Sequence, residues 1–152
     1  MVGPDHSEWV QWVLLLAVGG FAGNFVFSLS DHAMNGFFNR LEWVPVVSSA
    51  FAVSFLIVPF LIETTRRFLA LCAVVLGLQA LVGLLGFGLH LRAVFRQPGS
   101  TLFERLLTGA PPMAPLLFPN LVILALIGLW AFGRRLPRES RPTSRASSSP
   151  GD

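Results

Sequence analysis

Two histidines are the side chains in this sequence best suited to chemistry. His32 and His90 each lie close to the end of a long apolar run, and a helical path through these runs would bring both to the same edge of a membrane. Imidazole is the commonest metal ligand in proteins and also ligates haem. Asp31 and Met34 offer further ligand atoms beside His32. One hypothesis is therefore a site for a b-type haem or a metal ion, formed by these four residues.

The same histidines allow other interpretations. His90 could form a quinone site with an aromatic cluster that follows His32 in the sequence. That cluster consists of Phe37, Phe38 and Trp43. Alternatively, Asp31 and His32 cap the end of a helix, where a histidine interacts favourably with the helix dipole, and His90 contacts lipid headgroups. The sequence has no HExxH or HxxxH pattern, and a structural zinc site would need four ligands.

Neutral polar residues interrupt the apolar runs at a few positions. They are predicted to face the interior of a helix bundle, at Asn24, Ser48, Gln79 and Asn120. They could line a polar cavity, but we favour hydrogen bonds between helices, which contribute about 0.6 kcal/mol for a typical pair in a membrane. No Asp, Glu, Lys or Arg lies in the middle of any apolar run. This argues against proton-coupled pumps and multidrug exporters, which use a carboxylate inside the membrane.

Glycines recur on two of the apolar runs. Small residues let helix backbones approach closely in lipid, where the hydrophobic effect does not drive helices together. The predicted helix-packing positions are Gly19, Gly23, Gly83 and Gly86. These faces leave room for helices of another membrane protein or for self-association.

Four apolar runs must position all of these residues. They cover 9–29, 43–62, 68–91 and 113–133. A helix needs about 20 residues to cross the hydrocarbon core of a bilayer, so each run is long enough for one crossing. Charged residues make up 12% of the chain, against about 25% in soluble domains. The sequence therefore predicts an all-α, four-helix transmembrane bundle with an up-down-up-down path, formed by residues 1–135.

Prolines and polar segments predict where these helices break. Pro59 should kink the last turn of the second span, because proline lacks the N–H that the helix needs. The segment 101–108 could form a short amphipathic helix at the membrane surface. The Arg-, Ser- and Pro-rich tail, residues 136–152, is predicted to be disordered because it cannot bury enough apolar area to offset the entropy of ordering.

The distribution of arginine predicts the orientation. An even number of spans puts both chain ends on one side, together with Arg66, Arg67 and five arginines after the fourth span. Four arginines fall on the other side. Because positively charged loops stay in the cytoplasm, both termini are expected there, in a bacterial cytoplasmic membrane. The basic tail is expected to lie beside anionic lipid, and no nucleic-acid partner is expected.

These patterns lead to three hypotheses for function. The favoured one is a non-catalytic integral membrane subunit or accessory protein, which acts through helix packing and its 31–42 loop. The first alternative is a redox protein that binds haem, a metal or a quinone through His32 and His90. The second is a small oligomeric channel or transporter.

Overall fold

The fold is an all-α four-helix bundle, as the sequence predicts. The computed structural model describes residues 8–37, 39–97, 101–108 and 111–136. Four of its helical segments are long and apolar enough to cross a membrane, and they cover Glu8–Met34, Arg40–Leu61, Arg66–Arg96 and Ala114–Gly133. Four such helices indicate a multi-pass membrane protein. The predicted tail lies almost wholly outside the described residues.

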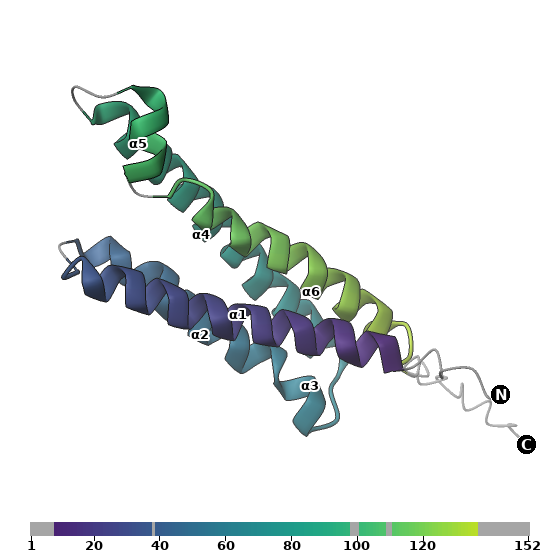
Figure 1. Ribbon diagram of the computed structural model, residues 1–152. Coiled ribbons are helices and arrows are strands. Elements are labelled where there is room, and N and C mark those ends of the chain that lie inside the picture. Colours follow the sequence, from purple (N-terminus) through teal and green to yellow (C-terminus); the bar gives the residue numbers. More distant parts are fainter. Residues whose placement is uncertain (1–7, 38, 98–100, 109–110, 137–152) are drawn as a thin grey trace, which may run out of the picture.

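The helices follow one another around the bundle (Figure 1). In chain order they are α1 (Glu8–Met34), η1 (Arg40–Glu42), α2 (Trp43–Leu56), α3 (Val58–Leu61), α4 (Arg66–Arg96), α5 (Leu102–Thr108), η2 (Ala114–Leu116) and α6 (Leu117–Gly133). Helix α1 packs against α2 and α6, and α4 packs against the same two helices. Short connections join the first three spans, and a longer segment that contains α5 joins α4 to α6, so the path is up-down-up-down.

Pro59 marks the break in the second span, and Thr65 caps the helix that follows it. Helix α2 ends at Leu56, and the short helix α3 continues to Leu61. Pro59 lies in the first turn of α3, where its missing N–H is tolerated, so the predicted kink is confirmed. Helix α4 then begins after Thr65, whose hydroxyl accepts a hydrogen bond from the backbone N–H of Phe68.

Helix α1 is longer than the apolar run predicted. It continues to Met34, so Asp31, His32 and Met34 lie on its last turn and not in a loop, which corrects the predicted start of the 31–42 loop. Asn35 follows and donates a side-chain hydrogen bond to the Asp31 carbonyl, at 2.9 Å. Gly36 then takes a φ of +77°, a conformation that glycine adopts without strain. The helix end is thus set by backbone chemistry and not by hydrophobicity.

The tightly packed core occupies the half of the bundle that contains the start of α1 and the end of α6. Leu14, Phe21, Leu56 and Leu76 are almost completely buried there. Phe21 meets Phe118 edge-to-face, with ring centroids 6.4 Å apart. Toward the other end of the bundle, the α1/α2 pair and the α4/α6 pair move apart (Figure 1).

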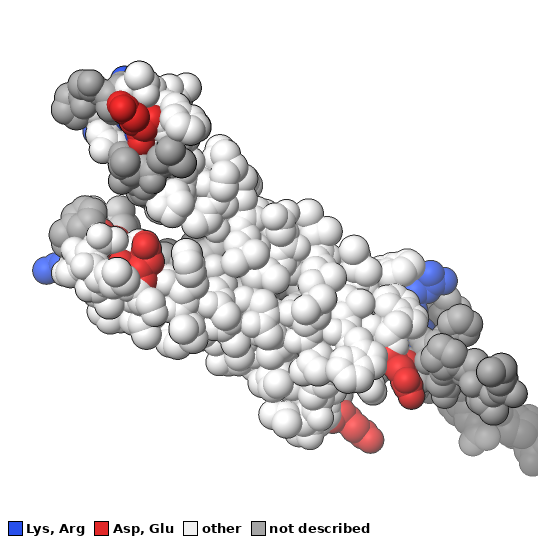
Figure 2. Space-filling model, in the orientation of Figure 1, with Lys and Arg blue, Asp and Glu red and all other residues white. Residues whose placement is uncertain are grey.

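Charged side chains gather at the two ends of the bundle. Figure 2 shows a broad uncharged band between them on the face in view. Arg66 lies at the end with the described chain termini, where its guanidinium donates to the Leu136 carbonyl at 2.9 Å. Asp31 and Arg92 lie at the other end. This distribution is the one expected of a bundle whose middle is surrounded by hydrocarbon.

Candidate functional site

A cleft opens between the two helix pairs at the end where they separate. Its volume is about 540 Å³, within the range of small-molecule pockets. Helix α1 and the start of α2 form one wall, and α4 with the start of α6 forms the other. Figure 2 shows this end of the molecule as two lobes with a notch between them.

The walls of the cleft are mainly apolar. They include Phe27, Val44, Leu85, Leu89 and Phe118. Polar side chains lie at the base and at the outer end, at Asn24, Asp31, His32, His90 and Arg92, and Ser28 lies between these two groups on α1. An apolar body with a polar end is the shape of a site for an amphiphilic molecule.

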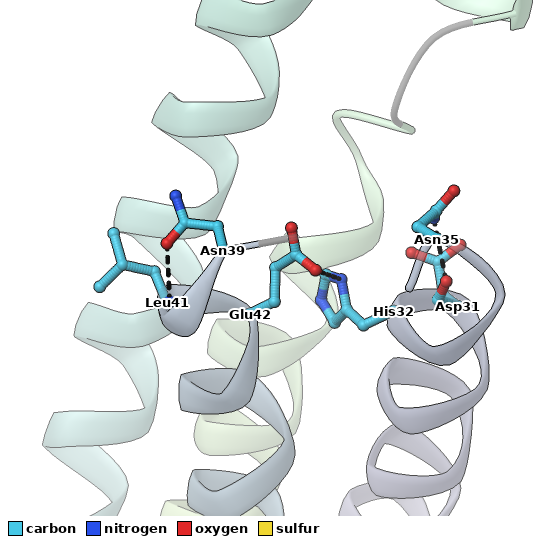
Figure 3. Close-up of polar contacts among 6 residues, drawn as sticks. All are labelled: Asp31, His32, Asn35, Asn39, Leu41 and Glu42. Atoms are coloured by element: carbon cyan, nitrogen blue, oxygen red, sulfur yellow. Dashed lines mark hydrogen bonds and ion pairs between the residues drawn. The ribbon is translucent and has the colours of Figure 1, made fainter. Parts of the chain in front are cut away.

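His32 is held by a carboxylate from the neighbouring element. Its Nδ1 lies 3.6 Å from Oε2 of Glu42 on η1 (Figure 3), and both side chains are nearly buried. Oε2 of Glu42 has no hydrogen-bond partner within the described residues. Asn39 fixes η1 by accepting a hydrogen bond from the Leu41 N–H at 2.9 Å (Figure 3). The carboxylate thus faces Nδ1 at ion-pair distance without a hydrogen bond and leaves Nε2 for other contacts.

Aromatic stacking supports the same corner. The rings of Phe37 and Trp43 are stacked with centroids 4.2 Å apart, and the ring of Phe37 lies 6.1 Å from that of His32. The predicted aromatic cluster is thus present for Phe37 and Trp43, and Phe38 lies outside the described residues. These rings brace the turn between α1 and η1.

His90 lies on the wall of the cleft opposite His32, where a backbone carbonyl holds its ring. Its Nδ1 lies 3.0 Å from the carbonyl oxygen of Pro111, just before η2. A carbonyl only accepts hydrogen bonds, so Nδ1 must carry the proton. In the neutral ring Nε2 is therefore an acceptor. The structure thus brings His32 and His90 to opposite walls of one cleft, and each ring uses Nδ1 for its support.

The base of the cleft contains a hydrogen bond between helices. Nδ2 of Asn24 on α1 donates to Oγ of Ser49 on α2 at 3.0 Å, and both side chains are buried. The Ser49 hydroxyl donates in turn to the Pro45 carbonyl at 2.7 Å. Ser48, the residue singled out in the sequence, is half-buried and bonds the same carbonyl at 3.3 Å. The sequence alone does not identify Ser49 as the partner of Asn24, because this contact depends on how α1 packs against α2.

Gln79 and Asn120 differ sharply in position. Gln79 is 3% exposed, and its Oε1 has no hydrogen-bond partner within the described residues. Asn120 is exposed, so its predicted interior position is wrong. Helix α6 buries Phe118, Val122 and neighbouring residues on one face, and Asn120 lies about 160° around the helix from Phe118. A single polar residue in an apolar helix did not reveal which face was buried.

The glycines divide into inward and outward positions. A Cβ on Gly83 would lie 2.6 Å from Phe118, and one on Gly86 would lie 3.1 Å from Pro115, so both allow close packing of α4 on α6 and η2. Gly19 and Gly23 are exposed with open space around them, so within this chain they do not pack helices as predicted. Gly20 contacts Leu121 instead. The buried position of Asn24 would have indicated this, since Gly20 lies only about 40° from it around the helix.

The four predicted metal or haem ligands do not all converge. Asp31, His32 and His90 line the cleft, whereas Met34 is 88% exposed and does not line it. The described residues contain no group of three or more His, Cys, Asp or Glu side chains that could hold a metal ion. The ligand atoms at the outer end are thus two imidazoles on opposite walls and one carboxylate.

Comparisons with protein-family models, curated proteins and solved structures found no match. The geometry of the cleft is therefore the basis for the functional proposal.

Proposed function

We propose that this is a non-catalytic integral membrane protein, an accessory protein or subunit, that binds an amphiphilic molecule in the cleft between its two helix pairs. The observation that carries the proposal is the 540 Å³ apolar cleft with His32 and His90 on opposite walls of its outer end. A lipid tail or an apolar ring would occupy the body of the cleft, and a polar head would lie between the imidazoles.

The depth of the cleft supports an amphiphile rather than a water-soluble ligand. Asn24 marks its base and His32 its outer end. The rise between them is about 12 Å at 1.5 Å per residue of helix. That distance exceeds what a headgroup layer alone would cover and reaches into the hydrocarbon core. The apolar walls at this depth favour a hydrocarbon occupant.

Orientation and partners are parts of the same proposal. With both termini in the cytoplasm, as the arginines favour, the cleft opens toward the outer side of a bacterial cytoplasmic membrane. Gly19 and Gly23 are exposed on α1, and a Cβ on either would meet nothing within 4 Å, which leaves that face open to a helix of a partner or of a second copy. As an accessory protein, the chain would hold the amphiphile in its cleft and contact the partner through this face of α1.

A redox protein is the second candidate. Both histidines present Nε2 as their remaining ring nitrogen, and two imidazoles on opposite walls could ligate one b-type haem. An absorption spectrum of the protein, purified from cells supplied with iron, decides between the two. A Soret band that disappears in His32→Ala and His90→Ala would favour the haem protein.

Two matched leucine variants on α4 test the main proposal. Leu89 lines the cleft and Leu81 does not, although their exposed fractions are similar, at 53% and 52%. Leu89→Trp should fill part of the cleft, whereas Leu81→Trp should project into lipid because Leu81 lies about 80° away around the helix. The protein is purified in mild detergent, and bound amphiphiles are extracted and identified by mass spectrometry.

We expect wild type and Leu81→Trp to carry the same amphiphile at similar stoichiometry and Leu89→Trp to carry less of it. Equal content in all three proteins would show that the lipid binds outside the cleft. An empty wild-type protein that also fails to take up added amphiphiles would contradict the proposal.

A further inference from the structure

We infer that the cleft selects amphiphiles whose head is a neutral hydroxyl group, with Nε2 of His90 as the principal acceptor. This inference rests on the proposed function, because it names the chemical class of the molecule that the cleft binds. It comes from the hydrogen bonds that fix the two imidazoles and from the charges beside them.

A backbone contact sets the tautomer of the neutral His90 ring. Its Nδ1 proton is committed to the Pro111 carbonyl at 3.0 Å. The neutral ring then has a lone pair on Nε2 and no further proton to donate. A ligand that contacts this nitrogen in the neutral ring must bring its own hydrogen-bond donor. Ketones, ethers and quinone carbonyls lack one, whereas a hydroxyl group has one.

His32 adds a second contact that a hydroxyl can satisfy in either protonation state. The carboxylate of Glu42 faces Nδ1 at 3.6 Å, so the proton of the ring favours that side. Nε2 accepts a hydrogen bond when the ring is neutral and donates one when the ring is charged. A hydroxyl group can act as donor and acceptor, so it matches both states.

The carboxylates beside the two histidines disfavour an amphiphile with an anionic head group. Asp31 lines the outer end of the cleft, and the nearly buried Glu42 lies directly behind His32. Both carboxylates would repel a phosphate or a carboxylate head. Arg92, the basic residue of the lining, is exposed to the surroundings. A neutral hydroxyl head therefore fits better than the head of an anionic phospholipid.

Two sources of hydroxyl heads share this chemistry. One is a hydroquinone with a short alkyl tail, and the other is a long-chain or isoprenoid alcohol. Full methylation of the hydroxyl groups keeps the apolar body but removes the donor. Decyl-hydroquinone with its dimethyl ether, and farnesol with its methyl ether, are therefore the probes.

Binding of the four probes to full-length protein in detergent is measured by calorimetry under argon. At least one hydroxyl probe should bind about tenfold more tightly than its own methyl ether, a difference of 1.4 kcal/mol, because the ether leaves Nε2 of His90 without a donor. Whichever probe shows the preference identifies the source of the head.

Two substitutions at one position separate recognition from structure. In His90→Asn the amide can still donate to Pro111 but no atom replaces Nε2, so the preference for hydroxyl over ether should fall to less than threefold. His90→Gln places an amide near the position of Nε2 and gives up the Pro111 contact, so it should retain more of the preference. If His90→Asn kept the full preference, or if hydroxyl and ether bound equally to wild type, the inference would be overturned while the cleft itself still stood. If Leu89→Trp bound every probe as tightly as wild type did, the proposed function would fail as well.

Discussion

Replacement of Gly83 by alanine probes the packing of α4 against the start of α6, which together form one wall of the cleft. A Cβ at this position would lie 2.6 Å from the Cβ of Phe118, 2.6 Å from Cδ of Pro119 and 2.7 Å from the carbonyl oxygen of Pro115. None of these atoms is the end of a flexible side chain. The added methyl group therefore cannot be accommodated by a rotamer change, and α4 and α6 must separate.

The structure gives the size of that separation. Ordinary contact for a Cβ begins at 3.4 Å, so the clash with Phe118 requires a shift of 3.4 − 2.6 = 0.8 Å. A gap of roughly 0.5–1 Å loses a quarter to a half of the dispersion energy of each contact across it. Overpacking of this kind costs about 1–3 kcal/mol, and the three rigid neighbours place Gly83→Ala near the upper end.

Reversible unfolding in mixed micelles of mild detergent and SDS, followed by tryptophan fluorescence, measures this cost. Gly77→Ala is the matched control, because it lies on the same helix with nothing within 4 Å of its Cβ, and it should stay within about 0.5 kcal/mol of wild type. Equal stabilities for Gly83→Ala and Gly77→Ala would refute the close approach of α4 to α6.

Three further predictions use the same unfolding assay or co-purification. Asn24→Leu should lower the free energy of unfolding by about 0.6 kcal/mol, and at most by about 1.7 kcal/mol, because it breaks the hydrogen bond to Ser49. Asn120→Leu should not destabilise the bundle, because Asn120 is exposed. A larger loss for Asn120→Leu than for Asn24→Leu would contradict the assigned helix faces. Gly36→Ala should cost about 1–2 kcal/mol because its φ is +77°, and an unchanged stability would argue against this helix end. Gly23→Leu should leave stability unchanged but reduce co-purification of a partner or of a second tagged copy, and undiminished co-purification would remove α1 as the interface.

The fold could be predicted from the sequence because lipid imposes a simple length rule. Runs of about 20 apolar residues predicted the four spans, and Pro59 predicted the break near the end of the second span. Helix ends were less predictable, because α1 continues past the last apolar residue to Met34 and stops only at Asn35 and Gly36. Local turn chemistry, and not hydrophobicity, decided where that helix ended.

The site could be predicted only in part. His32 and His90 were identified from their residue type and from their positions at the ends of spans. Their supports, Glu42 and the Pro111 carbonyl, come from other parts of the chain and depend on how the helices pack. The cleft itself depends on the divergence of the two helix pairs, which no local pattern in the sequence encodes.

Label transfer from a photoreactive amphiphile tests the central claim most directly. The full-length protein in lipid vesicles is irradiated with a long-chain alcohol that carries a diazirine in its tail, and the adducts are mapped by peptide mass spectrometry. The account predicts that adducts concentrate on the cleft walls, at Phe27 and Leu85, and that excess unlabelled alcohol suppresses them. Adducts spread over the outward-facing Leu16 and Ile123 as strongly as over the cleft, without competition, would contradict it.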